Sequence, residues 1–180
     1  MGGISKHYLN TFEHKFKKYN KPMQLPDYFG SMIGDKKHVR IAELGSGPVV
    51  TIGNSWPGVE VDLFASDELA FEYEEQLWNK YGVDPLIPID YRNFERTYYP
   101  ENYFDIVHCR NAIDHTKNFH RAIEEMKRIC RPGGWIYLAH APSQKTRFGG
   151  HHYWDYEKVP MPDFFLSYDG ELIVHTWQKP

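Results

Sequence analysis

Apolar runs alternate with amphipathic segments from residue 39 to residue 140. Val39, Ile41, Ala42 and Leu44 make the first run, which has the profile of a buried parallel strand. A second run covers residues 59–66, and further strands are expected around residues 103–109 and, after a Pro-Gly-Gly turn at 132–134, up to about residue 138. This alternation predicts a parallel sheet wound by right-handed crossovers.

Helical periodicity marks the segments between these strands. After the second run, one helix face collects Leu69, Ala70, Tyr73, Leu77 and Trp78. A later helix is expected over about residues 116–130, ended by a Pro-Gly-Gly turn. The first crossover has little room, because only residues 48–56 precede Pro57-Gly58, so one or two helical turns or a loop are expected there.

The two ends of the chain depart from this alternation. Residues 5–20 read as a basic amphipathic helix, with aromatic positions on one side. We expect this helix to pack beside a ligand site and cover it; membrane-surface or RNA binding is the alternative. Residues 1–38 are thus expected to form a helix and a connection, and residues 39–180 one domain that is reduced after residue 140.

The C-terminal segment predicts a β-hairpin. Asp169-Gly170 separates two β-prone runs, residues 164–168 and 171–177, and this dipeptide is a strong hairpin signal. Residues 141–160 before it are rich in Gly, Pro and aromatic residues and contain no clear periodic pattern. They read as a loop that covers or borders a substrate.

A glycine turn follows the first strand. The strand ends at Glu43, and Gly45 and Gly47 then allow a ligand to approach the backbone. A dinucleotide fingerprint would need a third glycine where this chain has Val50. The carboxylate of Glu43 would repel a pyrophosphate, but it could receive a cationic amino group.

Asp67 ends the second strand, about twenty residues beyond the glycine turn. A carboxylate at this place can accept hydrogen bonds from both hydroxyls of a ribose. The alternative is that Asp67 only caps the helix that follows, with Ser66 beside it. Asp62 is a weaker candidate, since it lies in the middle of the strand.

Four segments, in order, resemble one enzyme family. E-L-G-S-G-P over 43–48, Asp67 after the second strand, F-D-I-V-H-C-R-N-A-I-D-H over 104–115 and R-P-G-G-W-I-Y-L over 131–138 resemble the motifs of class I S-adenosyl-L-methionine (SAM)-dependent methyltransferases. The resemblance covers about residues 39–140. It implies an α/β, Rossmann-like domain with a mostly parallel sheet and a C-terminal antiparallel hairpin, with SAM as cofactor and S-adenosyl-L-homocysteine as product.

The resemblance also implies which residues bind the cofactor. Gly45, Ser46 and Gly47 would contact its methionine part, Glu43 its amino group and Asp67 its ribose. The adenine is expected at the end of the third strand, by Asn93 and Phe94, where Asn93 replaces the aspartate usual in the family. Arg110 and Asn111, after the fourth strand, would border the sulfonium and its methyl group.

Two histidines are candidates for a general base. His115 follows the fourth strand, with Asp114 beside it, and could take a proton from a hydroxyl group; its alternative role is to bond the local backbone. His151, in an aromatic loop, is the second candidate. His151, His152 and Asp155 could suggest a metal site. No metal is expected, however, because neighbouring side chains on an extended segment point in opposite directions and a third ligand at helical spacing is missing.

These features predict a methyltransferase acting on a small molecule, with a hydroxyl oxygen as the nucleophile. The Asp/Asn-Pro-Pro-aromatic tetrad of nucleobase amino methyltransferases is absent, since the chain has R-N-A-I over residues 110–113. Two alternatives stay open: a SAM-binding partner subunit without catalysis, and a nicotinamide-dependent oxidoreductase. The second is weakened by Glu43 and Val50.

Composition limits which partners and which cellular compartment are expected for the protein. The net charge of −3 gives no reason to expect nucleic acid, and no apolar run is long enough for a membrane span. The first residues lack the apolar core of a secretion signal, and Cys109 and Cys130 both fall in segments that read as buried. We therefore expect a cytoplasmic protein with free thiols, acting as a homo-oligomer or with a partner chain that completes its reduced substrate cover.

Overall fold

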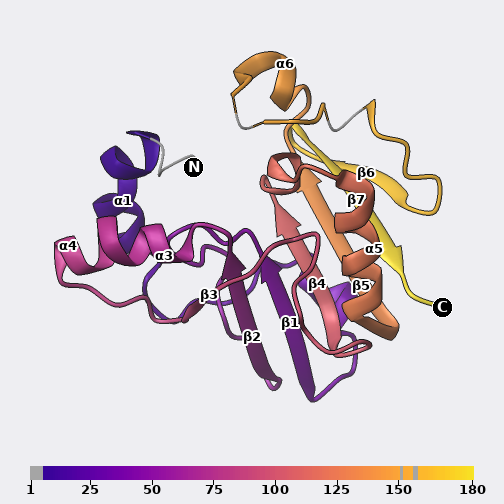
Figure 1. The fold of residues 1–180 in the computed structure, drawn as a ribbon. Coiled ribbons are helices and arrows are strands. Elements are labelled where there is room, and N and C mark those ends of the chain that lie inside the picture. The colour runs from indigo at the N-terminus through magenta and orange to yellow at the C-terminus, as the bar shows by residue number, and fades with distance from the viewer. Residues whose placement is uncertain (1–5, 151, 156–157) are drawn as a thin grey trace. The chain divides into compact units, whose positions relative to one another are not determined.

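The computed structural model of the protein describes residues 6–150, 152–155 and 158–180. Residues 1–92 and 93–180 form two compact units. Both units are built from strands with helices between them, as the alternation of patterns predicts (Figure 1). No helix in the described part of the chain combines the length and apolar character needed to cross a membrane.

The first unit is built on three parallel strands in the order β3-β2-β1. Its elements are α1 (Lys6–Tyr19), α2 (Phe29–Ile33), β1 (His38–Leu44), β2 (Glu60–Asp67), α3 (Ala70–Tyr73), the π-helical segment η1 (Glu74–Trp78), α4 (Asn79–Tyr81) and β3 (Ile89–Tyr91). The apolar positions that predicted β1 are all buried. Residues 45–59, between β1 and β2, contain no helix, so the short crossover is a loop.

Helix α1 is the amphipathic helix expected near the N-terminus. Its Phe12 is buried together with Tyr73 and Leu77 of the helical segment after β2, and Phe16 packs against this cluster. The aromatic side of α1 therefore covers part of the first unit, and its burial explains the pattern without a membrane surface.

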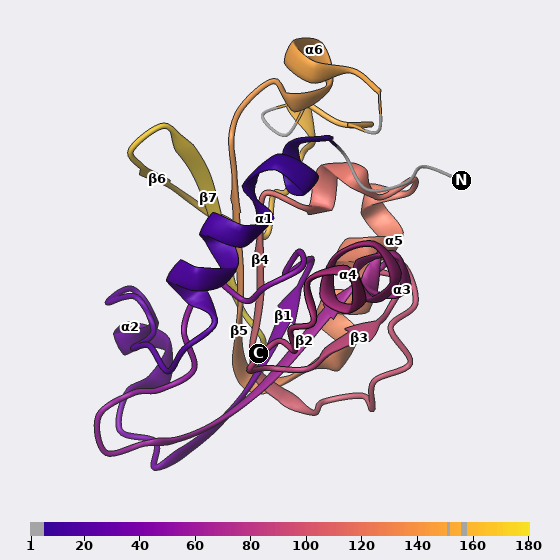
Figure 2. The same ribbon diagram turned by 90° about the vertical axis from the view of Figure 1, so that its left-hand side faces the viewer.

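The second unit holds four strands in the order β4-β5-β7-β6. Its elements are β4 (Phe104–Arg110), the 3-10 turn η2 (Ile113–His115), α5 (Phe119–Ile129), β5 (Cys130–His140), α6 (Gln144–Phe148), β6 (Phe165–Asp169) and β7 (Leu172–Gln178). Strands β4 and β5 are parallel, whereas β7 runs antiparallel to β5 and to β6. Figure 2 shows β6 and β7 as the hairpin, whose turn is completed by Gly170 with a φ of 59°.

The predicted α/β class, with mostly parallel strands and a C-terminal antiparallel hairpin, is confirmed. Two boundaries differ from expectation. Helix α5 begins at Phe119 instead of near residue 116, because Asn118 caps it by accepting a hydrogen bond from Arg121 N at 3.1 Å. Residues 131–134, expected as a turn, lie within β5 instead. The pairing of β4 with β5 shifts register there, because Phe104 pairs with Cys130 and Ile106 with Trp135. The organisation into residues 1–38 and 39–180 stays a prediction.

Candidate functional site

The glycine turn lies against the end of β2. The backbone N–H groups of Gly45 and Ser46 both donate to Ser66 O, at 2.8 and 3.2 Å. Gly45 and Gly47 have φ values of 75° and 68°, a region that residues with a Cβ rarely adopt. The turn therefore needs its glycines, and it presents bare backbone as expected.

The carboxylate of Asp67 is fixed at the same place. Its Oδ2 accepts a hydrogen bond from Gly47 N at 3.0 Å, and its Oδ1 accepts from Leu69 N at 2.9 Å and from the hydroxyl of Tyr73 at 3.3 Å. Asp67 is half-buried. The bond to Leu69 N is the local role that the sequence left open, and it coexists with the bond to the glycine turn.

Tyr73 also helps to position Asp67, although its sequence pattern placed it only on the apolar face of a helix. Its ring packs in the cluster with Phe12 of α1, while its hydroxyl reaches Asp67. Helix α1 thus stabilises the position of Asp67, at the end of β2, through the side chain of Tyr73. The helical pattern places Tyr73 on the packed face, but it does not show where the hydroxyl group points.

Glu43 is buried, with 4% of its surface exposed, in the part of β1 that pairs with Ala65 of β2. A carboxylate at this place can also accept a hydrogen bond from a cationic amino group. The glycine turn, Glu43 and Asp67, all in the first unit, therefore suit a ligand that combines an ammonium group with a ribose.

The residues expected near the adenine lie in the second unit. Asn93 is exposed, and its Oδ1 accepts a hydrogen bond from Glu95 N at 2.8 Å, which is a local turn contact. Phe94 is buried, with 6% of its surface exposed. Their roles toward an adenine stay predictions.

Arg110 and Asn111 follow β4 and are exposed. Asn111 has a φ of 53°, and it ties β4 to β5: its N–H donates to Ala139 O at 2.9 Å, and its Oδ1 accepts from Ala141 N at 3.1 Å. This arrangement gives Asn111 a structural part at the strand ends. Its expected contact with the methyl group, and that of Arg110, stay predictions.

A group of histidines surrounds one buried aspartate beyond the end of β4. Asp114 is fully buried, and its Oδ1 lies 2.6 Å from Nε2 of His140, the last residue of β5. Its Oδ2 shares a hydrogen bond with Nδ1 of His152. The ring of His115, which is exposed, lies with its centroid 4.4 Å from that of His152. We call Asp114, His115, His140 and His152 the histidine cluster.

The electrostatic balance of the cluster favours the ionised carboxylate. Burial is the largest single influence on the pKa of Asp114 and raises it. The hydrogen bond and charge of His140, the charge of His115 and the hydrogen bond of His152 together outweigh burial, so the pKa of Asp114 lies below its usual value. The cluster is therefore one anion surrounded by imidazoles.

Sequence patterns point to only part of this group. They single out His115 and Asp114, and they raise His152 only as one of two adjacent histidines in the aromatic loop. His140 was not predicted, and His151 lies outside the described residues. His140 ends a strand parallel to β4, so its position at the same sheet edge was a usable signal. His152 belongs to a segment without periodicity, and no pattern fixes its path.

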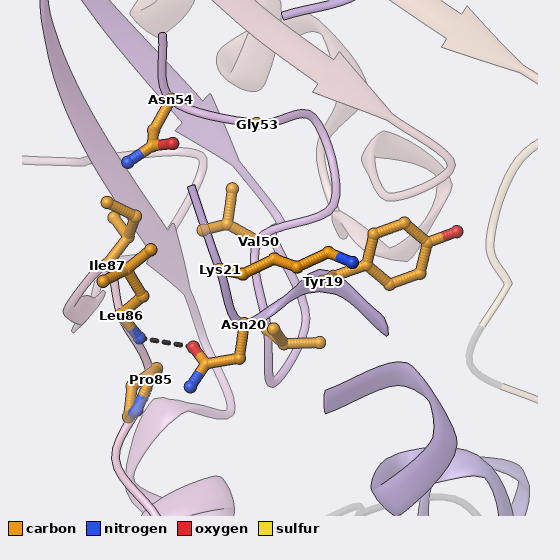
Figure 3. A pocket seen from close by; sticks show the side chains of 10 residues that line it. Tyr19, Asn20, Lys21, Val50, Gly53, Asn54, Pro85, Leu86 and Ile87 are labelled. Carbon is orange, nitrogen blue, oxygen red and sulfur yellow. Dashed lines mark hydrogen bonds between the residues drawn. The ribbon is translucent and has the colours of Figure 1, made fainter. Parts of the chain in front are cut away.

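The first unit also contains a small hollow. It is lined by residues 19–21, 49–50, 53–54 and 85–87 (Figure 3). The side chain of Asn20 bridges it, accepting a hydrogen bond from Leu86 N and donating to Asp84 O at 3.0 Å. None of the predicted site residues lines this hollow. Its contacts join α1 to the segment before β3, which is a structural role.

Comparison with known families agrees with these features. Residues 65–138 match a family model described as a methyltransferase domain. The matched segment runs from the end of β2, which carries Asp67, into β5. No curated protein matches the sequence.

Solved structures show the fold. The chain is similar to a proposed SAM-dependent methyltransferase of Methanococcus maripaludis, with 13% identity, a TM-score of 0.59, and coverage of 99% of this chain and 97% of that chain. It is also similar to a proposed methyltransferase of Bacillus halodurans, with 17% identity, a TM-score of 0.52, and coverage of 78% and 69%. Of two other matching structures, the chain spans only 50% and 43% of the length.

Proposed function

Since the chain carries a class I methyltransferase domain whose cofactor is SAM, we propose that it transfers a methyl group to a hydroxyl oxygen of a small molecule. The observation that carries the proposal is the bond between Gly47 N and Asp67 Oδ2 at 3.0 Å. It joins the bare backbone turn to the carboxylate, and both are features that an amino-acid nucleoside needs.

SAM supplies a methyl group already activated on a sulfonium, so the chain mainly has to bind, orient and exclude water. We assign the methionine part to Gly45, Ser46 and Gly47, and its ammonium to the buried carboxylate of Glu43. We assign the ribose hydroxyls to Asp67. Three of the about four acceptor positions of its carboxylate already accept hydrogen bonds from Gly47, Leu69 and Tyr73, so a ribose would replace at least one of these bonds. Asn93, Phe94, Arg110 and Asn111 are proposed to complete the cofactor contacts.

A hydroxyl nucleophile has to lose its proton, and the histidine cluster offers the base. His115 is exposed at the carboxyl end of the second unit's parallel strands, the edge at which open α/β sheets bind ligands. Proton transfer to a positioned histidine contributes about 10²–10⁴-fold to a rate. His151 stays the second candidate.

The proposal also covers the type of acceptor and the cellular compartment. A net charge of −3 supports a small acceptor more than nucleic acid. Cys109 and Cys130 are both buried and unbridged, which is the state of thiols in a reducing compartment, so we place the reaction in the cytoplasm.

The test is methyl transfer by the full chain from radiolabelled SAM to a panel of hydroxyl, amine and carbon acceptors, beside calorimetry with S-adenosyl-L-homocysteine. Binding of the nucleoside and labelling of hydroxyl acceptors are the expected results. Binding without transfer to any acceptor would instead indicate a subunit that binds SAM without catalysis. Binding of NADH but not of S-adenosyl-L-homocysteine would indicate a hydride-transfer enzyme.

A further inference from the structure

We propose that Asp114, His115 and His152 bind a divalent transition-metal ion. Asp114 and His115 are neighbours in η2. His152 lies in the segment after α6, 38 positions after Asp114, so it meets them only in the fold. The pattern of residues 151–155 alone argued against a metal, because one extended segment cannot direct several ligands to one point. The fold brings Asp114 and His115 of η2 to His152, and so provides the further ligands that residues 151–155 do not have by themselves.

The donor atoms are close enough to share one ion. One nitrogen of each of the two rings and one oxygen of Asp114 all lie within 4.8 Å of one another. His152 Nδ1 and Asp114 Oδ2 already share a proton in a hydrogen bond, and an ion would take the place of that proton.

The surroundings hold the ligands in place. His140 Nε2 lies 2.6 Å from the second oxygen of Asp114, which fixes the orientation of the carboxylate. Tyr153 N donates to Asp114 O at 2.8 Å, and Trp154 Nε1 donates to Thr116 O at 2.7 Å. The segment that carries His152 is therefore held to the backbone of Asp114 and of Thr116, which follows η2. Such outer contacts are typical of metal sites, where they orient the ligands.

The chemistry of the donors selects the kind of ion. Two imidazoles and one carboxylate suit Zn²⁺ and its first-row neighbours, whereas Mg²⁺ and Ca²⁺ prefer oxygen ligands. Three protein ligands leave an open position for water or for an oxygen of a substrate. With an ion in place, His115 would be a ligand instead of the base; the ion would lower the pKa of a hydroxyl group bound to it, and the proton would pass to solvent water. This catalytic consequence rests on the proposed function, but the metal site itself does not.

The chain contains a matched control for surface coordination. His38, Glu60 and Asp62 in the first unit also bring donor atoms within 4.8 Å of one another. There the His38 and Asp62 side chains are 40% and 44% exposed and Glu60 is exposed as well, whereas Asp114 is buried. A surface group of this kind binds ions weakly, because its side chains are well solvated.

The experiment is a titration of the full chain, stripped with a chelator, with Co²⁺ and with Zn²⁺. Visible ligand-field absorption reports Co²⁺ bound by nitrogen and oxygen donors, and Zn²⁺ should displace it. We expect one ion per chain, at least ~10–100-fold weaker binding in His115→Ala and in His152→Gln, and wild-type binding in His38→Ala. Circular dichroism of each variant confirms that it is folded.

Three results of the titration would contradict the metal site. Absence of the cobalt bands, bands that survive either His115→Ala or His152→Gln, or bands that disappear in His38→Ala would each overturn the site. No step of this titration uses SAM or an acceptor. A failure of the proposed methyl transfer therefore leaves the metal result unchanged, and the reverse also holds.

Discussion

The N–H of Gly47 donates to Oδ2 of Asp67 at 3.0 Å, across a separation of twenty residues. The bond joins the loop after β1 to the end of β2, where parallel pairing already aligns Leu44 with Ser66. A glycine turn and an acidic strand end are common separately. Held together, they make a backbone surface and a carboxylate that one ligand can contact at the same time.

Replacement of this carboxylate should weaken cofactor binding. Asp67→Ala is expected to lower the affinity for S-adenosyl-L-homocysteine by ~1.5–3 kcal/mol, because hydrogen bonds to a charged group are lost. Calorimetry measures the change, and Asp62→Ala is the control, since Asp62 lies on the same strand but pairs with His38 at 2.8 Å. Equal affinity in Asp67→Ala and wild type would remove Asp67 from the site.

The glycine turn can be tested against a glycine with similar backbone geometry. Gly47 and Gly58 have φ values of 68° and 70°, so an alanine at either position should cost ~1–2 kcal/mol in the free energy of unfolding. A Cβ at Gly58 meets nothing within 4 Å. Gly47→Ala alone should also weaken nucleoside binding; equal losses of affinity in both variants would show that the turn has no direct part in binding.

The base is tested by kinetics. His115→Ala should reduce turnover ~100-fold or more while the affinity for SAM changes little, since general-base catalysis contributes at that level. His120→Ala is a control on an exposed histidine of α5. Near-normal turnover of His115→Ala would assign His115 a structural role and leave His151 as the candidate.

Stability at acid pH should depend on Glu125. This buried carboxylate accepts hydrogen bonds from Thr97 N at 2.8 Å, from the Thr97 hydroxyl at 2.6 Å and from Arg128 at 2.7 Å. Burial raises the pKa of Glu125, but the bonds from Arg128 and Thr97 outweigh it and place the pKa below the usual value of 4.5. The folded state therefore binds this proton less readily than the unfolded chain does.

The stabilisation by Glu125 is thus complete above pH 4.5 and is lost as the pH falls through the lower folded value. At neutral pH, Glu125→Gln should lower the free energy of unfolding by ~1.5–3 kcal/mol, and the difference from wild type should shrink below about pH 4. Glu124→Gln, whose side chain is 72% exposed, should change stability by less than ~0.5 kcal/mol. A difference that stays constant from pH 7 to pH 3 would contradict this assignment.

The sequence predicted those parts of the molecule that local pattern determines. Alternating apolar runs located β1 and β2, and Asp169-Gly170 located the final hairpin, because strand burial and turn geometry depend on nearby residues. The same reasoning placed Asp67 beside the glycine turn. It could not show that Tyr73 reaches back to Asp67, since that contact depends on how α1 packs.

The histidine cluster was only half predictable for a related reason. Asp114 and His140 follow or end neighbouring parallel strands, so their common edge follows from topology. His152 arrives on a segment that is fixed by Tyr153 and Trp154 through single hydrogen bonds to η2 and Thr116. Such contacts between an irregular segment and a distant turn leave no periodic trace in a sequence.

The most direct test of the account is a crystal structure of the full chain with S-adenosyl-L-homocysteine. We predict ribose hydroxyls within hydrogen-bonding distance of the Asp67 carboxylate, and the amino-acid part against the backbone of residues 45–47 with its ammonium toward Glu43. A nucleoside bound elsewhere, or bound without contact to Asp67 and the glycine turn, would contradict the central claim.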